Sequence, residues 1–229
     1  HDDTKRGGGG TSQRNKSGHE RNRRSMSARE FSAAAPSARA RTADIARATV
    51  FDVLRSVAES DAYANLVLPK TIRSYRLDHR DAGFATELTY GTLRHQGTYD
   101  AILSRCVDRS IEKVGTTTLI VLRMGVHQLL NMRVPAHAAL NQSVSLAREK
   151  IGAGPASFIN AVLRRVSERT PEEWYELIIE DAKDDTERMA LLASHPGWIV
   201  RSMRQALVAH GRPASEIEQL LEADNLAPV

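Results

Sequence analysis

The chain has 229 residues, of which 41% are hydrophobic and only 5% aromatic, so it can bury one core, filled mainly by Leu, Val, Ile and Ala, with an appended subdomain. No apolar run is long enough to cross a bilayer and none follows the charged N-terminus, so we expect neither a membrane helix nor a secretory signal, and a cytoplasmic protein. The single cysteine, Cys106, excludes a disulfide framework and is expected to be a buried apolar side chain.

The net charge of +4 conceals a segregation of charge along the chain. Residues 1–41 contain 10 Lys and Arg against 4 Asp and Glu, residues 42–165 contain 16 against 11, and residues 166–229 contain 6 against 13. The two basic parts suit a polyanionic partner, whereas the acidic last part does not.

Residues 1–41 are dominated by Gly, Ser, Ala and Arg and include the glycine run from Gly7 to Gly10. Because ordering such a segment would bury almost no apolar surface, we expect a disordered basic arm. The arm either attracts phosphates without sequence specificity or serves as a solubilising tail, and the sequence leaves both interpretations open.

From Thr42 onward the apolar residues follow helical spacing. Thr42 is a suitable N-cap for a first helix, and Asp78, with Asp81 three residues later, is a suitable N-cap for a third. In that third helix Gly91 would let a neighbouring helix approach closely. The apolar positions of the first four predicted helices are Ala46, Val50, Val53, Leu54 and Val57; Tyr63, Leu66, Val67 and Leu68; Phe84 and Leu88; and Tyr99, Ile102, Leu103 and Cys106.

The centre of the predicted core is residues 119–144, where one helix passes through a tight turn into a second. Residues 119–130 carry apolar side chains on nearly every face, which is typical of a helix surrounded by other helices. Pro135 suits the start of the next helix, and apolar residues at helical spacing from Leu140 to Ile151 indicate that the two helices pack as a hairpin.

The rest of the chain also predicts helices. A turn at residues 152–155 precedes a helix with the apolar residues Phe158 and Leu163, and Thr170 followed by Pro171 predicts the N-cap and first residue of another. Further helices are expected over residues 186–192, 196–209 and 214–222. Since no segment shows the spacing of a strand, the predicted fold class is all-α.

Sequence motifs for catalysis are missing from the chain, which contains no Gly-rich nucleotide loop, no HExxH, no GxSxG and no cysteine pair. His127 and His137 have no carboxylate pair nearby, so we interpret them as ordinary buried or exposed histidines rather than metal ligands. Asp78 and Asp81 are better explained as capping groups than as an acid and a base. We therefore expect no catalytic residue, metal site or cofactor site in this chain.

Three strings, Asp81–Asp100 (DAGFATELTYGTLRHQGTYD), Leu122–Arg148 (LRMGVHQLLNMRVPAHAALNQSVSLAR) and Phe158–Val166 (FINAVLRRV), resemble in order and spacing the NusB-like RNA-binding domain. This domain occurs as the transcription antitermination factor NusB and as the N-terminal part of the RsmB (Sun/Fmu) family of 16S rRNA cytosine-C5 methyltransferases. The resemblance implies a NusB-like helical bundle.

The residues after Val166 favour the methyltransferase family. Ser194–Met203 (SHPGWIVRSM) and Glu222–Val229 (EADNLAPV) look like the helical connector that leads into its catalytic domain. Together with the basic arm over residues 1–41 expected from composition, the resemblance implies a NusB-like RNA-binding domain over 42–169 and a connector over 170–229.

The catalytic half of that family binds S-adenosylmethionine and uses two cysteines, and none of those residues can be carried over to this chain. The resemblance thus implies a part that is not catalytic alone, within a full-length rRNA methyltransferase that uses S-adenosylmethionine. Two alternatives stay open: a stand-alone NusB-type antitermination adaptor that binds RNA together with a ribosomal protein, and a helical protein–protein module. The expected partner is ribosomal RNA, with a ribosomal protein as a second candidate partner, and neither a membrane nor DNA is expected.

The candidate RNA-binding residues rest on charge and helix face. The helix that buries Phe158 and Leu163 has arginines on its other face, and the central helix, its turn and the third helix carry further arginines. The candidates are Arg164, Arg165, Arg123, Arg133 and Arg94. For each of them the alternative is a solvated or intramolecularly paired arginine.

Overall fold

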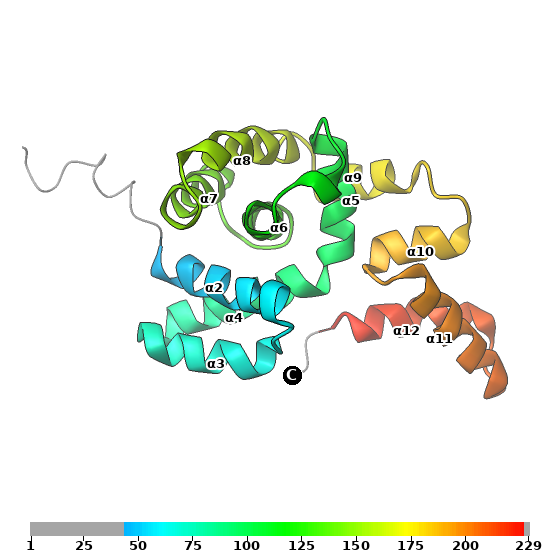
Figure 1. Ribbon diagram of the computed structural model, residues 1–229. Helices are drawn as coiled ribbons and strands as arrows, with labels where there is room; N and C mark the ends of the chain where they lie inside the picture. Colours follow the sequence, from blue (N-terminus) through cyan, green and yellow to red (C-terminus); the bar gives the residue numbers. More distant parts are fainter. Residues whose placement is uncertain (1–43, 227–229) are drawn as a thin grey trace, which may run out of the picture. The chain divides into compact units, whose positions relative to one another are not determined.

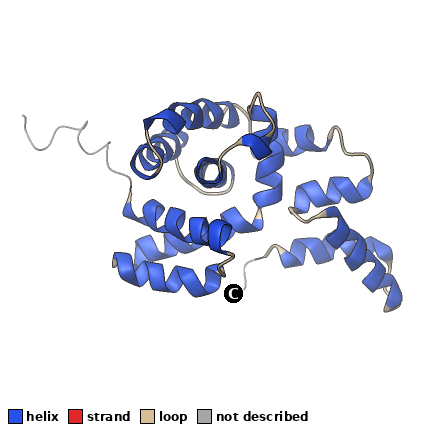
Figure 2. Cartoon of the chain, in the orientation of Figure 1, coloured by secondary structure: helices blue, strands red, loops and turns tan. Residues whose placement is uncertain are grey.

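The computed structural model describes residues 44–226, and every regular element within that range is a helix (Figure 2), which confirms the predicted all-α class. The predicted arm and Thr42 lie outside the described residues. The helices are α2 (Ile45–Ser60), α3 (Ala64–Tyr75), α4 (His79–Arg94), α5 (Gln96–Cys106), η1 (Ile111–Lys113), α6 (Thr116–Leu130), α7 (Ala136–Lys150), α8 (Ala153–Val166), α9 (Pro171–Ile179), α10 (Asp185–Ala193), α11 (Gly197–Ala209), η2 (Ala214–Glu216) and α12 (Ile217–Asp224).

The centre of the fold is α6, as its sequence predicts. It contacts α2, α4, α5, α7 and α8, and Figure 1 shows it end-on among them. Val121, Leu122 and Val126 have no exposed surface. The α6–α7 hairpin is also confirmed, with Pro135 as the residue immediately before α7. We call the apolar cluster around α6, which includes residues of α2, α4, α5, α7, α8 and α9, the central core.

Two glycines let helices approach α6 closely. A Cβ atom at Gly91 of α4 would lie 2.1 Å from the imidazole of His127, which confirms the predicted close approach. A Cβ at Gly125 of α6 would lie 2.5 Å from the side chain of Leu163 in α8, a contact that the sequence did not suggest. Each glycine therefore brings a partner helix against the centre, because any larger residue would overlap a buried side chain.

Buried polar side chains connect the surrounding helices to α6. Arg47 of α2 donates to Gln128 Oε1 at 2.7 Å, and it also pairs with Asp44. Asp44, rather than the predicted Thr42, is the N-cap of α2, since its carboxylate accepts the backbone N–H of Ala46 at 3.0 Å. The carboxylate thus caps the helix and neutralises a buried guanidinium at the same time.

Two other helix starts follow the predicted capping chemistry. The carboxylate of Asp78 accepts the N–H of Asp81 at the start of α4. At α9 the hydroxyl of Thr170 accepts the N–H of Glu173 while the Glu173 carboxylate accepts the N–H of Thr170, which is a complete capping box. These contacts fix where α4 and α9 begin.

The apolar packing of the central core continues past residue 169. Trp174 and Ile178 of α9 belong to it, and the Trp174 indole donates to the Val166 carbonyl at 2.9 Å. A second and smaller group, which we call the C-terminal cluster, consists of Met189, Val200, Ile217 and Leu221 from α10, α11 and α12. The domain boundary at 169 stays a prediction, but α9 packs with the helices before it.

Helix α3 is longer than its sequence suggested. The short helix predicted around Leu66 and Leu68 runs on through Pro69 to Tyr75, although proline cannot donate to the helical ladder. Leu68 is buried while Pro69 is exposed, so the ring faces outward. None of the helices between residues 44 and 226 combines the length and the apolar character that a membrane span requires.

Candidate nucleic-acid interface

Arg123, one of the five predicted RNA-binding arginines, holds two helices of the central core together. Its Nε and Nη2 donate to the two carboxylate oxygens of Asp100 in α5, each at 2.7 Å, and its side chain is only 15% exposed. A bidentate pair of this kind uses the N–H groups along the Nε/Nη2 edge of the guanidinium, which a bidentate phosphate contact would also need. The geometry gives Arg123 an intramolecular role.

Arg165 is also engaged within the chain. Its Nη1 donates to the carbonyl of Cys106 at 2.8 Å and lies 3.3 Å from a carboxylate oxygen of Asp108, which connects α8 to the end of α5. Its side chain remains 52% exposed, so the guanidinium keeps donors that face solvent. Arg165 therefore combines a structural contact with an accessible positive charge.

The remaining three candidates are free of ion pairs within residues 44–226. Arg164 is exposed in the last turn of α8, Arg133 is exposed in the turn between α6 and α7, and Arg94 is half-buried in the last turn of α4. The structure thus places the unpaired candidates on three separate elements. Arg164 and Arg133 have the exposure that a phosphate contact requires.

A set of hydrogen-bonded side chains, made up of Tyr99, His127 and Asn131, lies close enough to Arg94 for its charge to act on His127. The Tyr99 hydroxyl is 2.6 Å from His127 Nδ1 and accepts a hydrogen bond from the Asn131 amide at 2.6 Å, while His127 Nε2 lies 3.5 Å from a carboxylate oxygen of Glu87. Burial, with a smaller contribution from the positive charges of His95 and Arg94, lowers the pKa of His127 to about 4. His127 is therefore neutral at neutral pH and ties α6 to α5.

Cys106 is buried, as predicted. Burial raises the pKa of its thiol to about 11, which leaves little thiolate at neutral pH. Among the residues that the structure describes, no group of three or more His, Cys, Asp or Glu side chains is arranged to hold a metal ion. Cys106 is therefore a buried apolar side chain of the central core rather than a reactive thiolate.

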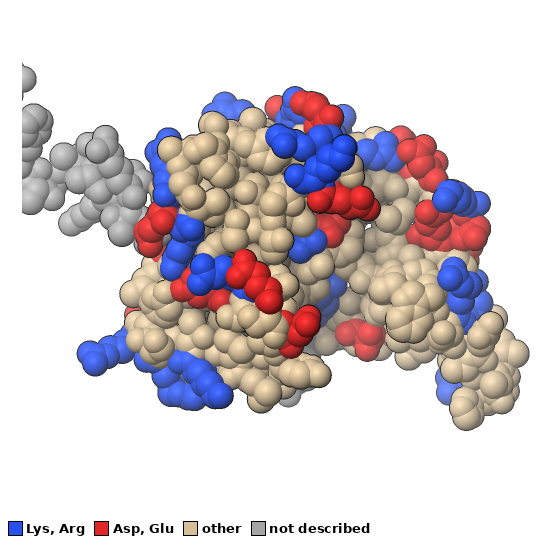
Figure 3. Space-filling view, viewed as in Figure 1, with Lys and Arg blue, Asp and Glu red and all other residues tan. Residues whose placement is uncertain are grey.

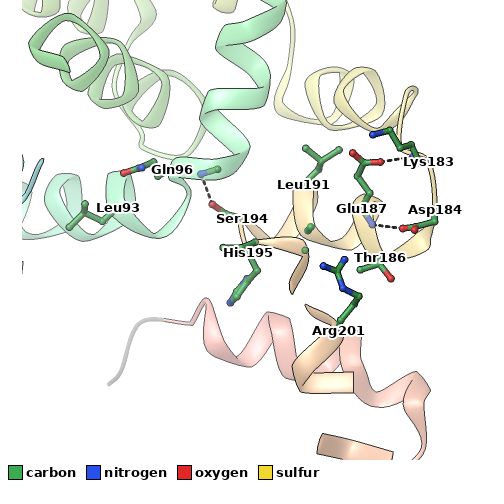
Figure 4. Close-up of a pocket in the computed structure, with 14 residues that line it drawn as sticks. Leu93, Gln96, Lys183, Asp184, Thr186, Glu187, Leu191, Ser194, His195 and Arg201 are labelled. Atoms are coloured by element: carbon green, nitrogen blue, oxygen red, sulfur yellow. Dashed lines mark hydrogen bonds between the residues drawn. The ribbon is translucent and has the colours of Figure 1, made fainter. Parts of the chain in front are cut away.

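A cavity of 760 Å³ lies where α10 and the start of α11 meet the junction of α4 and α5 (Figure 4). The Ser194 hydroxyl, on this side of α10, accepts the backbone N–H of Gly97 at 2.8 Å. The Thr98 hydroxyl donates to the Leu191 carbonyl at 2.6 Å. The Ser-His-Pro string recognised in the sequence therefore attaches the C-terminal helices to the first turn of α5.

Charges of both signs line this cavity. Lys183 and Arg201 line it, and the carboxylates of Asp184 and Glu187 lie between these two cations in the view (Figure 4). The Glu187 carboxylate accepts the N–H of Lys183, and the Asp184 carboxylate accepts the N–H of Glu187, so both cap the start of α10.

A further contact joins the C-terminal helices to one another. His195, next to Ser194, contacts the Asp224 carboxylate at 2.8 Å and so joins the end of α10 to the end of α12. The cavity walls serve mainly to join helices.

Sequence comparisons relate this helical arrangement to known proteins. The model of the NusB family matches residues 44–168. A Mycobacterium tuberculosis protein, named provisionally as a methyltransferase, is 39% identical over 191 residues, which is 83% of this chain and 41% of its own length. A Bacillus subtilis protein, named provisionally as ribosomal RNA small subunit methyltransferase B, is 30% identical over 70% of this chain and 35% of its own length. The chain therefore spans less than half the length of these curated relatives.

A solved structure confirms the fold. Antitermination factor NusB, in a crystal structure with NusE and double-stranded RNA, superimposes with a TM-score of 0.51 at 21% identity. The match covers 54% of this chain and 94% of that chain. Almost the whole of that NusB thus corresponds to about half of the present chain, and the predicted NusB-like bundle is confirmed.

Proposed function

Since the chain belongs to the NusB family, we propose that it is the RNA-binding N-terminal region of an S-adenosylmethionine-dependent 16S rRNA cytosine-C5 methyltransferase. In this role the helices hold ribosomal RNA so that a catalytic domain meets one cytosine. Arg164 and Arg133, which are exposed and unpaired within the described residues, are the best placed of the predicted arginines to contact phosphates.

The observation that carries this proposal is the extent of similarity to proteins with methyltransferase names. The match to the M. tuberculosis protein covers 191 residues, whereas the NusB family model ends at residue 168. Even if that match contained all of residues 1–168, it would have to continue into α9 and the helices after it. The similarity therefore includes helices that a NusB domain alone does not require, which favours the methyltransferase over a stand-alone adaptor.

The charge distribution supports an RNA partner. Residues 42–165 contain 16 Lys and Arg against 11 Asp and Glu, and the described part of this range is the part that folds like NusB. A net positive helical surface attracts a phosphate backbone irrespective of sequence. We expect ribosomal RNA to be the partner, while a ribosomal protein as a second partner stays a prediction.

The residues present do not fit an S-adenosylmethionine site. Such a site needs a Gly-rich turn between a strand and a helix, and residues 44–226 contain no strand. Cys106 is buried with a raised pKa, which does not suit an attacking thiolate. In our proposal the cofactor and the catalytic cysteines therefore belong to a catalytic domain that this chain does not include.

The proposal is tested by disrupting the gene that encodes this chain and reading 5-methylcytosine in 16S rRNA by bisulfite sequencing. We expect the loss of one methylated position, restored by the intact gene. An unchanged methylation pattern together with a transcription-termination defect would instead favour the antitermination adaptor. Calorimetry on the purified 229-residue chain should detect no binding of S-adenosylmethionine, and micromolar affinity would contradict the assignment.

A further inference from the structure

The outer face of α3 carries an aromatic side chain, an aliphatic side chain and two cations in one line. Leu66, Lys70 and Arg73 are spaced i, i+4 and i+7, which places them on one stripe of α3, and Tyr63 is the N-cap residue immediately before the helix. All four are exposed, Tyr63 by 73% and Leu66 by 59%. We call these four residues the α3 stripe.

The positive charge of the α3 stripe is not neutralised by neighbours on the same segment. Residues 62–77 contain no Asp or Glu, and the exposed Arg76 continues the run of cations. Arg80 follows in the first turn of α4, where the carboxylates of Asp78 and Asp81 accompany it. Within residues 44–226, Lys70, Arg73, Arg76 and Arg80 form no ion pair or side-chain hydrogen bond. Figure 3 shows basic side chains gathered over α3, at the lower left, with tan rather than red atoms around them.

The acidic group that α3 packs against is already bound. Asp52 of α2 lies 3.0 Å from Lys150 Nζ, accepts a hydrogen bond from the Tyr75 hydroxyl and lies 3.9 Å from Arg55. It adds no free negative charge beneath the stripe. The exposed Glu59 and Asp61 instead lie at the Tyr63 end of α3, so the cationic end is the one that starts at Lys70. The stripe thus has an aromatic end and a phosphate-attracting end.

We propose that a single-stranded segment of RNA runs along α3, with an unpaired base stacked on Tyr63 and phosphates bound by Lys70 and Arg73. Tyr63 and Arg73 are ten residues apart, which is about 15 Å along a helix. Exposed aromatic rings beside a row of cations are the usual platform for single strands, because every base can stack and every linkage carries a phosphate. Arg76 and Arg80 continue the phosphate path beyond Arg73.

An RNA partner fits this surface better than a protein partner. The apolar part is confined to Tyr63 and Leu66, whereas the core of a protein interface is depleted of charge and rich in apolar groups. The Tyr63 hydroxyl makes no hydrogen bond within the described residues, and the residue is 73% exposed, so its ring is accessible to a partner. This inference rests on the proposed RNA-binding function and specifies where the RNA lies.

The test measures binding of the full 229-residue chain to a short mixed-sequence RNA, both single-stranded and annealed to its complement, over a range of salt concentrations. Lys70→Ala with Arg73→Ala should weaken binding of both probes and lower the slope of log K against log salt by about 0.7 per lost contact for the single strand. Tyr63→Ala should weaken binding of the single strand by roughly 5- to 150-fold and leave the duplex nearly unchanged.

Matched variants separate position from charge. Tyr63→Phe keeps the ring and should bind like the wild type. Lys183→Ala with Arg201→Ala removes the same charge from exposed positions on the C-terminal helices and should change binding much less. Since the side chains of the α3 stripe are exposed, all variants should keep the wild-type melting temperature, and circular dichroism checks this.

The outcomes distinguish the inference from the function on which it rests. If the variants of the α3 stripe bind RNA like the wild type while Arg164→Ala binds weakly, the RNA lies elsewhere and the inference is wrong, although the proposed function stands. Equal losses from the α3 double variant and from the Lys183/Arg201 control would reduce the effect to net charge and also overturn the inference. A wild-type chain that binds neither probe would overturn both.

Discussion

The central core and the C-terminal cluster are stabilised by different means. Within residues 44–226, the central core contains twenty-five buried apolar residues arranged around one helix, whereas the C-terminal cluster contains four. The segment from α10 to α12 instead carries ion pairs that are exposed at least in part, among them Arg188 with Glu218, Arg204 with Asp185 and Arg212 with Glu216. Exposed ion pairs contribute little individually.

This difference predicts two levels of stability in one chain. Burial around α6 should hold the NusB-like helices together, because buried apolar area is the largest favourable contribution to folding. Helices α10 to α12 should open locally at a lower free energy, since few apolar contacts hold them. Hydrogen bonds such as that from the Gly97 N–H to the Ser194 hydroxyl attach these helices to α5 without adding apolar residues to the central core. The predictions below test this comparison, from the largest expected effect to the smallest.

The largest loss is expected in the middle of α6. Leu122 has no exposed surface, so Leu122→Ala should lower the free energy of unfolding by about 2–5 kcal/mol through lost burial and a cavity. Leu129, which is only partly buried, should lose less when it is replaced by alanine. Chemical denaturation measures both values. A smaller loss at Leu122 than at Leu129 would contradict the central position of α6.

The central core should also weaken in acid because of His127. Burial lowers its pKa from 6.5 to about 4, so between these values the unfolded chain binds more protons than the folded chain. Stability is therefore fully present above about pH 6.5 and falls as the pH drops towards 4, by about 3 kcal/mol in total.

This contribution is isolated by comparing the unfolding free energy of His127→Gln at several pH values with that of the wild type. The variant should lose less stability between pH 6.5 and 4, because glutamine does not titrate. His137→Gln is the matched control, since it removes an exposed imidazole rather than the buried one. Parallel pH curves for His127→Gln and the wild type would show that His127 does not carry the effect.

A smaller loss is expected in the C-terminal cluster. Ile217 is buried there, and Ile217→Ala should cost about 2 kcal/mol, near the lower end for such a change, because so small a cluster can collapse around the gap. Hydrogen exchange should speed up in α10 to α12 and stay unchanged in α6. Leu220→Ala, on the exposed side of α12, is the control. Faster exchange throughout the chain would mean that the two regions unfold together.

Sequence periodicity predicted most of this architecture, since apolar spacing identifies a helix wherever one face is buried. The α6–α7 hairpin, the cap at Asp78 and the capping box at Thr170 were accessible because their signals lie within a few residues. The apolar positions predicted for the second helix end at Leu68, whereas α3 continues through Pro69 to Tyr75, over residues where the sequence is mostly polar. The spacing from Tyr63 to Arg73 becomes visible only on the longer helix.

The candidate interface was less predictable than the fold. Charge and helix face selected Arg123 and Arg165, but each meets a partner from a distant part of the sequence: Asp100 lies 23 residues from Arg123, and the Cys106 carbonyl lies 59 residues from Arg165. Such pairs depend on how helices cross, which local patterns do not encode. All five arginines stay predictions as RNA contacts, and for Arg123 and Arg165 the structure adds the intramolecular contacts that they make.

The smallest effect is expected from an exposed ion pair, and it gives the sharpest contrast between the two regions. Arg188 Nη2 lies 2.9 Å from Glu218 Oε1, with both side chains well exposed, so a double-mutant cycle should give a coupling below about 1 kcal/mol. Concentrated salt should remove most of it, because the screening length falls to about 3 Å at 1 M. The same cycle on Arg123 and Asp100 should give a larger coupling that salt barely changes, since that pair is bidentate and largely buried. If the Arg188 pair proved the stronger, ion pairs rather than apolar burial would stabilise the C-terminal helices, and their local opening should then follow salt concentration instead of the Ile217 contact.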